Sequence, residues 1–371
     1  MKLTHYNIFC GRRFVTGSLE AKNGCITRID IEKEAETPSL PYLIPGLVEA
    51  HSHGNSGADF SDGDYEGLKK MGAFYAENGV TSFAPTSMTL PYETLAAAFD
   101  TAVAYRKEAD PKKAFLAGIH MEGPFFSEKK KGAQNGDYLR LPDIEAFRAL
   151  QKDCGGLIRI VDVAPELEGA AAFAKEASSL CRVSVAHTDA NYAQAAAVFD
   201  AGATHLTHLF NAMPGIHHRN PAVIGAASER DSVRAELICD GLHVHESAIR
   251  MAFKLFPGRI CLVSDSLRCA GMPDGAYELG GQTVYLAEGI ARLADGTIAG
   301  SVITLTEGLK NVVRFGIPRE QAILSATLIP AEELGVADTV GSLETGKRAD
   351  MLLCDETLAL KEVFLAGRSL G

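Results

Sequence analysis

Residues 43–53 read LIPGLVEAHSH, an apolar run that ends in the pair His51 and His53. An apolar run of this length predicts a buried strand. Histidines at its C-terminal end are candidate metal ligands, although such a pair by itself also occurs where histidines only hydrogen-bond to their neighbours. Four more candidate ligands each end a strand-like segment of their own, namely Glu122, His187, His208 and Asp265. Imidazole and carboxylate groups bind borderline divalent cations, and a barrel gathers successive strand ends in one place, so the set predicts a metal-dependent hydrolase.

From Leu43 onward, eight strand-like segments alternate with helical stretches. The segments are LIPGLVEAH (43–51), TSFAPTS (81–87), FLAGIHMEG (115–123), LIRIVDVAPE (157–166), RVSVAHTD (182–189), HLTHLFN (205–211), RAELICDG (234–241) and RICLVSDS (259–266). Stretches between them, such as residues 65–78 and 190–203, place apolar residues three and four positions apart, as in an amphipathic helix. The succession predicts an α/β protein with a (β/α)8 TIM-type barrel over residues 45–344.

The two ends of the chain have a different pattern. Residues 1–44 alternate short β-rich stretches with turn signals such as Asn23-Gly24, and residues 345–371 do the same. We expect these two segments to build one small β-sandwich domain. Residues 276–299 are Gly-rich and strand-like, and we interpret them as a hairpin that projects toward this β domain and can pack on it.

Composition restricts the partners and the compartment. A chain of 371 residues with 46% hydrophobic content can bury a large core, and a net charge of −11 argues against nucleic acid and anionic membrane as partners. The eight cysteines are scattered without a CxxC pair, which indicates free thiols and a reducing compartment. The first residues lack the apolar stretch of a signal peptide, and no segment is long and apolar enough for a membrane span. We expect a cytoplasmic protein.

Strand periodicity sorts the histidines, because residues two apart share a face of a strand. His51 and His53 therefore point the same way. His205 and His208 are three apart, so only one of them faces the barrel axis, and His208 is nearer the end of its segment. His205 is then a packed or hydrogen-bonded neighbour.

Two further polar residues lie deeper in the same segments. Glu49 shares a face with His51, and His120 shares a face with Glu122. Both suit a layer that orients the metal ligands. Each is equally compatible with a lone buried polar residue.

Several motifs resemble those of the N-acetylglucosamine-6-phosphate deacetylases of the amidohydrolase superfamily. They follow the family order through nearly the whole chain: PGLVEAHSHG (45–54), GIHMEGPFFSEKKKGAQN (118–135), VAHTDANYAQAAAVFDAGATHLTHLFNAMPGIHHRNPAVIG (185–225), CDGLHVH (239–245), LVSDSLRCAGMPDGAYELGG (262–281) and LADGTIAGSVITL (293–305). THLFNAMP followed by HHR is specific to this family, whereas HxH and DGLH indicate only the superfamily. The resemblance implies removal of an acetyl group from N-acetylglucosamine 6-phosphate.

The resemblance also implies a metal site. Glu122, His187 and His208 match the ligands of the main ion. Because this chain has both histidines of the HxH pair, which some members replace, we expect a second ion held by His51, His53 and Asp265, with Glu122 bridging. Residues 157–166 contain no lysine that could form the carbamylated bridge of other two-metal amidohydrolases. The ligand types suit Zn, Fe, Mn or Co.

The chemistry explains these residue types. A metal lowers the pKa of bound water to about 7 and stabilises the developing oxyanion of a poorly electrophilic acetamide. Expulsion of the amine needs a proton, which one group must accept from water and pass to nitrogen. We expect Asp265 to be this general base and acid.

Candidates for phosphate recognition also follow from the resemblance. The side chain of Asn211, the backbone amide of Ala212, Arg219 and His243 occupy positions that contact the sugar phosphate in the family. The arginine can reach in from the neighbouring subunit, so a homodimer is implied. Without the motif, an Arg or His in a polar loop is more often a solvated surface residue.

The loop after EGP departs from the commonest family pattern. Gln134 stands where many members have a histidine that polarises the acetyl carbonyl, and glutamine can donate only a neutral hydrogen bond. We expect Gln134 to contact the substrate and a second metal to compensate for the missing cation. Lys129, Lys130 and Lys131 are interpreted as a solvated surface run.

Rival functions differ mainly in substrate. Deacetylation of N-acetylgalactosamine 6-phosphate is the nearest alternative, because the two sugars differ only at the C4 hydroxyl. Another cyclic-amide or dipeptide amidohydrolase would not need the phosphate set, and a binding protein without activity would not need Asp265 beside a complete ligand set.

Overall fold

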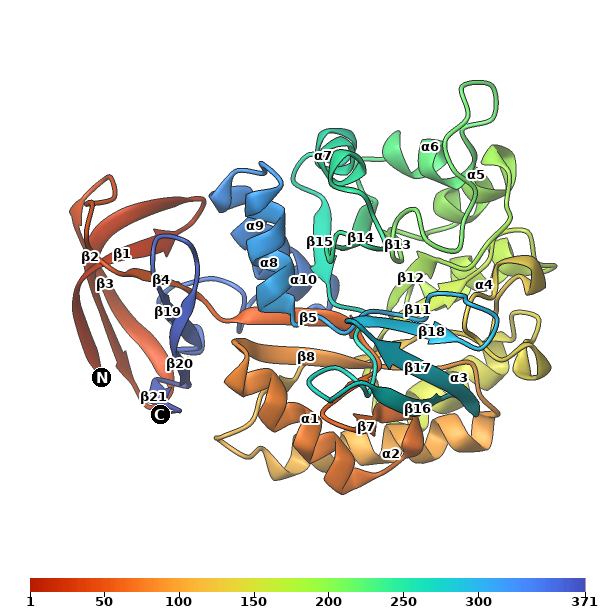
Figure 1. Cartoon of the computed structure of the whole chain (residues 1–371), viewed down its shortest axis with the longest axis horizontal. Coiled ribbons are helices and arrows are strands. Elements are labelled where there is room, and N and C mark those ends of the chain that lie inside the picture. The colour runs from red at the N-terminus through yellow and green to blue at the C-terminus, as the bar shows by residue number, and fades with distance from the viewer. Residues whose placement is uncertain (371) are drawn as a thin grey trace.

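The computed structural model describes residues 1–370, and its centre is a barrel of eight parallel strands (Figure 1). The strands follow one another around the barrel in chain order: β5 (Leu47–Ser52), β8 (Val80–Ser87), β10 (Ile119–Met121), β11 (Ile158–Val163), β12 (Arg182–Val185), β13 (His205–Leu206), β14 (Arg234–Ile238) and β15 (Ile260–Val263). A short strand, β9 (Phe115–Leu116), pairs with β8. The predicted TIM-type barrel is confirmed. Each of its strands overlaps one of the predicted segments, and β5 and β8 extend beyond theirs by one residue, Ser52 and Val80.

Side chains and turns close the barrel between its first and last strands. The Glu49 carboxylate accepts hydrogen bonds from the backbone amide of Ser264 at 3.2 Å and from that of His51 at 3.2 Å. The amide of Asp265 donates to the carbonyl of His51 at 2.9 Å. These bonds hold the end of β15 against the end of β5, so two segments that carry site residues lie side by side.

Helices surround the barrel, and several of them begin at a side-chain cap. Asp64, Asp143, Asn191 and Thr304 each accept a hydrogen bond from a first-turn amide, which satisfies donors that a helix leaves unpaired. The helices are α1 (Tyr65–Glu77), α2 (Tyr92–Glu108), α3 (Ile144–Asp153), α4 (Ala170–Ala177), α5 (Tyr192–Asp200), α6 (Ala222–Ser228), α7 (Glu246–Leu255), α8 (Leu305–Arg314), α9 (Arg319–Ala326) and α10 (Leu328–Glu333). Short 3-10 turns follow at η1 (Phe60–Asp62), η2 (Glu128–Lys130) and η3 (Gly136–Tyr138).

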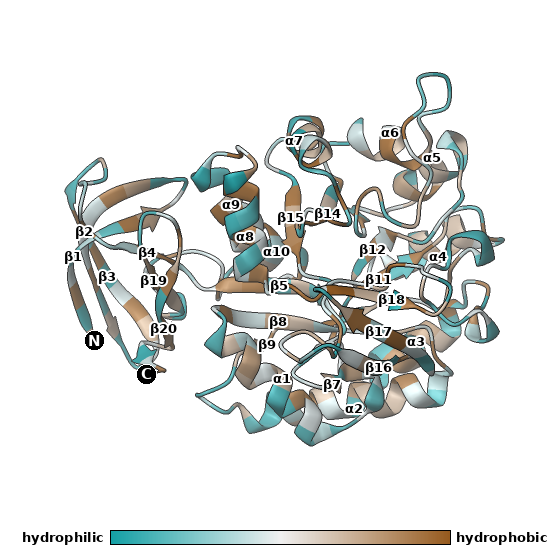
Figure 2. Cartoon of the chain, in the orientation of Figure 1, coloured by the Kyte–Doolittle hydropathy of each residue, from teal (hydrophilic) through white to brown (hydrophobic). Residues whose placement is uncertain are grey.

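Apolar residues fill the barrel and its contacts with the helices. Figure 2 shows hydrophobic residues concentrated on the barrel strands, with hydrophilic residues along the outer surfaces of the helices. Val48, Ile160 and Val263 of the strands pack in one cluster with Ile329 and Leu334. The last two come from α10 and the residue after it, so this helix covers the barrel end opposite the site.

None of the helices within residues 1–370 is long and apolar enough to cross a bilayer.

Both ends of the chain form one seven-stranded sheet beside the barrel (Figure 1). Its order is β21-β20-β19-β4-β1-β2-β3, so strand β4 joins the N-terminal strands to the C-terminal ones. The strands are β1 (Lys2–Cys10), β2 (Arg13–Lys22), β3 (Cys25–Lys33), β4 (Tyr42–Pro45), β19 (Met351–Cys354), β20 (Leu360–Leu365) and β21 (Arg368–Ser369). Asn23 and Gly24 both have positive φ in the β2–β3 turn, as the Asn-Gly signal predicted. The chain passes at Gly46 from this sheet into β5.

The segment expected to pack on the β domain lies elsewhere, and that prediction is wrong. Strands β16 (Gly275–Leu279), β17 (Gln282–Ala287) and β18 (Ile290–Leu293) form a separate antiparallel sheet. Its apolar face packs against Met88, Leu267 and Cys269, in loops at the barrel mouth, on the side of the barrel away from the terminal sheet (Figure 1). The hairpin pattern predicts pairing between neighbouring strands, but the surface that the sheet covers depends on tertiary contacts. A two-stranded ribbon of β6 (Gly54–Asn55) and β7 (Ala58–Asp59) follows β5.

Candidate metal centre and active site

All six predicted metal ligands meet at the C-terminal ends of the barrel strands, with the carboxylate of Glu122 at the centre. Each of the six is buried, with at most 7% of its surface exposed. They come from strand β5 and the loops that follow β5, β10, β12, β13 and β15: His51, His53, Glu122, His187, His208 and Asp265. The parallel barrel thus collects residues that lie more than 200 positions apart in the sequence.

Two histidines, His187 and His208, lie close to the Oε1 atom of Glu122 and form a first ligand group with it. The Oε1 atom of Glu122 is 3.2 Å from Nε2 of His187 and 3.2 Å from Nε2 of His208. The two Nε2 atoms are 3.0 Å apart, and the ring of Phe126 stacks on His187 at 4.4 Å. Two imidazole nitrogens and a carboxylate oxygen at this spacing could hold a divalent cation.

A second group shares the same carboxylate. The Oε2 atom of Glu122 is 3.3 Å from Nε2 of His53, and its Oε1 atom is 3.5 Å from Nε2 of His51. Oδ1 of Asp265 lies 3.5 Å from Nε2 of His51 and 3.4 Å from Nε2 of His53. Glu122 therefore faces both groups, which is the position that a bridging ligand requires.

Hydrogen bonds to Nδ1 orient three of the four histidine rings. Glu236 Oε2 lies 2.8 Å from Nδ1 of His51, the Thr86 carbonyl lies 3.2 Å from Nδ1 of His53, and the Lys130 carbonyl lies 2.8 Å from Nδ1 of His187. Acceptors at Nδ1 place the proton there and leave the Nε2 lone pair directed at the cluster.

The donor atoms fit a bound divalent cation. Within residues 1–370, the buried Nε2 atom of His51 has no hydrogen-bond partner, although it points into the cluster. A buried nitrogen without a partner is costly, and a cation at this position would satisfy it. The groups around this nitrogen, namely the carboxylates of Glu122 and Asp265 and the imidazole of His53, are of the types that Zn, Fe, Mn and Co accept.

The groups of the cluster polarise one another. Burial by itself would raise the pKa of Glu122, but the surrounding histidines, His51 first, outweigh burial and hold that pKa well below its usual range. The pKa of Asp265 is lowered for the same reason, against burial, by His51 and His53. Burial would lower the pKa of His208, but its hydrogen bond to Glu122 dominates and raises that pKa to about 9. The site therefore keeps its carboxylates ionised and favours positive charge.

Strained backbone positions three of the six residues. His187, His208 and Asp265 have φ values of 43°, 32° and 48°, in the left-handed region that residues with a Cβ seldom adopt. Each follows a strand end, where the turn carries the side chain back over the barrel mouth. Such strain costs on the order of 1 kcal/mol per residue and is concentrated at functional sites.

A cavity of about 360 Å³ opens above the cluster. Of the predicted substrate-binding residues, four line it: Gln134, Asn211, Ala212 and His243. Leu279 of the three-stranded sheet and residues 297, 298 and 300 line it as well, so that sheet covers one side of the site. Lys129 and Lys130, interpreted from the sequence as a solvated run, also line the cavity.

Gln134 and His243 are held by neighbours. The Oε1 atom of Gln134 accepts a hydrogen bond from the Thr89 amide at 2.7 Å, and its Nε2 donates to Oε2 of Glu122. In this structure the side-chain amide is thus directed at the Glu122 carboxylate. Nδ1 of His243 lies 2.6 Å from Oδ2 of Asp240, which leaves its Nε2 for the cavity.

Arg219 lies apart from the cavity of its own chain. It is exposed in the loop between β13 and α6, which stands out from the barrel beside α6 (Figure 1). Its Nη1 atom is 2.7 Å from Nε2 of His218. This structure therefore does not bring Arg219 together with the other predicted phosphate contacts.

Glu236 contacts the site but was missed from the sequence. It accepts from His51, and its sequence signal is a lone carboxylate within the apolar segment AELI of strand β14. Glu49 and His120, for which a ligand-orienting role was an alternative, are both fully buried and hydrogen-bonded. His205 is buried beside Glu236.

Comparison with known proteins agrees with this geometry. Residues 42–370 match the sequence model of the amidohydrolase family. The chain belongs to the amidohydrolase family. It is accordingly a hydrolase of the metal-dependent type, and the predicted resemblance is confirmed.

Three relatives indicate its place within the family. The N-acetylglucosamine-6-phosphate deacetylase of Bacillus subtilis (strain 168) is 38% identical over 86% of this chain and 82% of its own length. The N-acetylgalactosamine-6-phosphate deacetylase of Escherichia coli O157:H7 is 35% identical over 91% of this chain and 88% of its own length. A mutant N-acetyl-D-glucosamine-6-phosphate deacetylase from Mycobacterium smegmatis, solved with N-acetyl-D-glucosamine-6-phosphate, aligns with a TM-score of 0.93 and 30% identity over 100% of this chain and 99% of that one.

Proposed function

We propose that this chain hydrolyses N-acetyl-D-glucosamine 6-phosphate to D-glucosamine 6-phosphate and acetate. The observation that carries the proposal is the Glu122 carboxylate, which faces two groups of candidate ligands directly below a cavity lined by Asn211, Ala212 and His243. Relatives over most of the chain length bear this activity in their names.

The ligand groups divide into two ion positions. Glu122, His187 and His208 would hold one ion, and His51, His53 and Asp265 would hold a second, with Glu122 shared. A divalent cation held by these residues, Zn, Fe, Mn or Co, would supply a Lewis acid that lowers the pKa of bound water to about 7.

Asp265 moves the proton. Its carboxylate is ionised, because the neighbouring histidines keep its pKa low, so it can accept a proton from the attacking water. The water oxygen bonds to the acetyl carbon, and the carbon–nitrogen bond breaks. The amine nitrogen leaves with the proton that Asp265 returns, and the products are acetate and the free amino sugar.

Three of the residues expected to contact the phosphate end of the substrate line the same cavity. The Asn211 side-chain amide and the Ala212 backbone amide are hydrogen-bond donors, and Nε2 of His243 is left for the cavity because its Nδ1 is paired with Asp240. Because Arg219 is exposed on a projecting loop, we propose a homodimer in which Arg219 of each subunit reaches the cavity of its partner. A guanidinium offers paired donors for phosphate oxygens.

The eight free cysteines support a cytoplasmic enzyme, since thiols persist in a reducing compartment.

N-acetylgalactosamine 6-phosphate is the alternative substrate. One relative at 35% identity bears that name, and the two sugars differ only at C4. The Bacillus subtilis and Vibrio furnissii relatives, at 38% and 36%, and the Mycobacterium smegmatis structure favour the gluco sugar.

One assay separates these possibilities. Acetate release is measured from both 6-phosphorylated N-acetylhexosamines with the purified protein, and the metal content of the same preparation is determined. We expect kcat/KM at least about tenfold higher for the gluco sugar, the ratio that a single well-placed hydroxyl contact of about 1.4 kcal/mol supplies. A higher value for the galacto sugar would assign the alternative, and no acetate from either would refute the proposal.

A further inference from the structure

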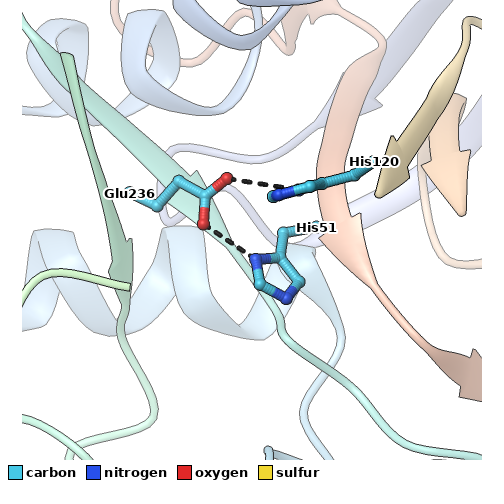
Figure 3. A group of neighbouring side chains, drawn as sticks. All are labelled: His51, His120 and Glu236. Carbon is cyan, nitrogen blue, oxygen red and sulfur yellow. Dashed lines mark hydrogen bonds and ion pairs between the residues drawn. The ribbon is translucent and has the colours of Figure 1, made fainter. Parts of the chain in front are cut away.

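A fully buried layer of ionisable side chains lies directly beneath the candidate metal centre. Figure 3 shows three of its members, His51, His120 and Glu236, of which none exposes any surface. Oε2 of Glu236 is 2.8 Å from Nδ1 of His51, and Oε1 of Glu236 is 3.6 Å from Nδ1 of His120. The proposed mechanism uses neither Glu236 nor His120.

The hydrogen bonds exclude a third metal site among these residues. Nδ1 of His120 is 3.1 Å from the carbonyl oxygen of Ala50, and Nε2 of His120 is 3.0 Å from Oδ1 of Asp162. Both partners are acceptors, so both ring nitrogens of His120 donate and no lone pair remains for a cation. Nδ1 of His51 donates to Glu236 in the same way. The group is a hydrogen-bonded network.

Glu236 is held from the far side of the barrel. Its Oε1 atom accepts from Nε2 of His205 at 3.0 Å, and Nδ1 of His205 donates to Oε2 of Glu333 at 2.6 Å. Glu333 ends helix α10, and its Oε1 atom accepts from Nη1 of Arg234 at 2.6 Å. The Glu236 carboxylate is therefore fixed between the metal centre and the end of the barrel that α10 covers.

Glu236 also contacts both halves of the metal centre. Besides the His51 ring, its Oε2 atom accepts from the backbone amide of His208 at 3.2 Å. His208 is one of the residues with left-handed backbone, so this bond supports a strained turn. The hydrogen bond to His51 involves its Nδ1 atom, so the proton of the ring lies on Nδ1 and Nε2 is left free.

We propose that Glu236 is a positioning residue for the second metal position, the one formed by His51, His53 and Asp265. By accepting the Nδ1 proton of His51, it leaves the Nε2 lone pair directed at Glu122 and Asp265, where a cation would bind. The inference rests on the proposed two-ion function and adds to it the residue that sets the second position.

A glutamine at position 236 makes a sharp test. The carboxylate accepts from His51 with one oxygen and from His205 with the other, but a side-chain amide has only one oxygen. In Glu236→Gln, one of the two histidines must therefore change tautomer or lose its bond. A His51 ring with its proton on Nε2 cannot bind an ion through that atom.

The experiment measures ion stoichiometry and affinity. Wild type and Glu236→Gln are titrated with Co²⁺, followed by elemental analysis after dialysis and by the absorption spectrum of bound cobalt. We expect the variant to bind its second ion about 10- to 100-fold more weakly, while the ion at Glu122, His187 and His208 stays bound. Retention of the first ion shows that the barrel of the variant is folded.

Asp162→Asn is the matched control. Asp162 is equally buried and accepts hydrogen bonds from His120 and Thr207. Neither of these residues is a proposed metal ligand. We expect this variant to keep two ions with wild-type affinity. Equal loss of the second ion in both variants would show a general effect of removing buried charge and would overturn the inference.

A second measurement is made on the wild-type protein and needs a variant only to assign the signal. In the zinc-loaded wild type, nitrogen-15 spectra of the imidazole rings should show a proton on Nδ1 of His51, assigned by its absence in His51→Asn. A proton on Nε2 instead would overturn the inference. If Glu236→Gln binds two ions as tightly as wild type, only this inference fails, whereas a wild type that binds fewer than two ions contradicts the two-ion function as well.

Discussion

Asp265 combines two tasks that its surroundings make compatible. Its Oδ1 atom lies within 3.5 Å of Nε2 of both His51 and His53, and its backbone carbonyl accepts from the Ser301 amide at 2.7 Å. The histidines keep the pKa of the carboxyl low, so Asp265 is ionised before the reaction and readily releases a proton that it has taken up. Its fixed backbone keeps the returning proton close to the position of the leaving nitrogen.

Replacement of this carboxylate should separate binding from turnover. Asp265→Asn keeps the size of the side chain and the backbone hydrogen bonds of the residue, but it removes the proton acceptor. We expect kcat to fall by about 10²–10⁴-fold, with the substrate and the ion at Glu122, His187 and His208 still bound. Steady-state kinetics, together with calorimetric titration of substrate, measure the two effects. A kcat near that of wild type would remove Asp265 from the mechanism.

His205 should make stability depend on pH. Burial would lower its pKa, but hydrogen bonds to Glu236 and Glu333 outweigh burial and raise the pKa to about 10, from 6.5 in the unfolded chain. The folded state then binds one more proton between these values. The stabilisation is complete below about pH 6.5 and is lost as pH rises through 10, by up to about 1.4 kcal/mol per pH unit.

The measurement compares slopes. The free energy of unfolding is determined by denaturant titration between pH 6.5 and 10 for wild type and for His205→Gln. Wild type should lose stability more steeply than the variant, whatever the absolute stability of the variant. Parallel slopes would show that His205 does not carry the extra proton.

The candidate catalytic residues lie in loops at the ends of the barrel strands. The segment after β18 packs against one of these loops, the turn that contains Asp265. Gly300 has φ of 47°, and a Cβ there would lie 2.8 Å from the Asp265 carbonyl and 2.7 Å from Cδ2 of Leu267. Ser301, the next residue, binds the Asp265 backbone. The segment that follows β18 and the Asp265 turn are therefore packed without room for a side chain between them.

Gly300→Ala should disturb this contact. We expect a loss of about 1–2 kcal/mol in stability from the left-handed backbone, and a fall in kcat of about 10- to 100-fold because Asp265 is displaced. Gly296→Ala is the control, since Gly296 also has positive φ but open space around it. It should lose similar stability and keep its kcat. Equal kcat values for the two variants would contradict the packing argument.

In the whole molecule, the site is placed at the barrel end away from the terminal sheet (Figure 1). That sheet continues directly into β5 at Gly46, and Arg319 of α9 joins the two parts by pairing with Glu36 at 2.6 Å and stacking on Phe14 and Tyr42. The Arg219 loop projects on another side, free to meet a second subunit.

Mixed subunits can test whether Arg219 serves the partner. By itself, Arg219→Ala should raise KM for the phosphorylated sugar far more than for N-acetylglucosamine, because it removes a phosphate contact. In a dimer of one Arg219→Ala and one Asp265→Asn subunit, one site receives both intact residues if Arg219 acts across the interface. Refolding the variants together in equal amounts should then restore about a quarter of wild-type activity. No recovery would place Arg219 in its own subunit's site, and about half of wild-type activity would place it outside any site.

The barrel and the ligand set could be predicted because they depend on local pattern. A buried strand must be apolar, and a polar residue at its C-terminal end is visible against that background, as with His51, His187 and Asp265. Parallel strands then bring their ends together whatever the loops do. Strand periodicity alone does not separate His208 from His205, because β13 ends at Leu206 and the left-handed φ of 32° at His208 sets the direction of its side chain outside the strand.

Tertiary structure alone decided the rest. The three-stranded sheet covers Met88 and Leu267 at the barrel mouth because its apolar face matches theirs, and a hairpin pattern does not say which surface that face will meet. Glu236 bonds His51 from 185 positions away, and only closure of the barrel makes the two neighbours. The charge that a buried carboxylate or histidine carries, as in Glu236 and His205, depends on partners that the linear chain does not bring together.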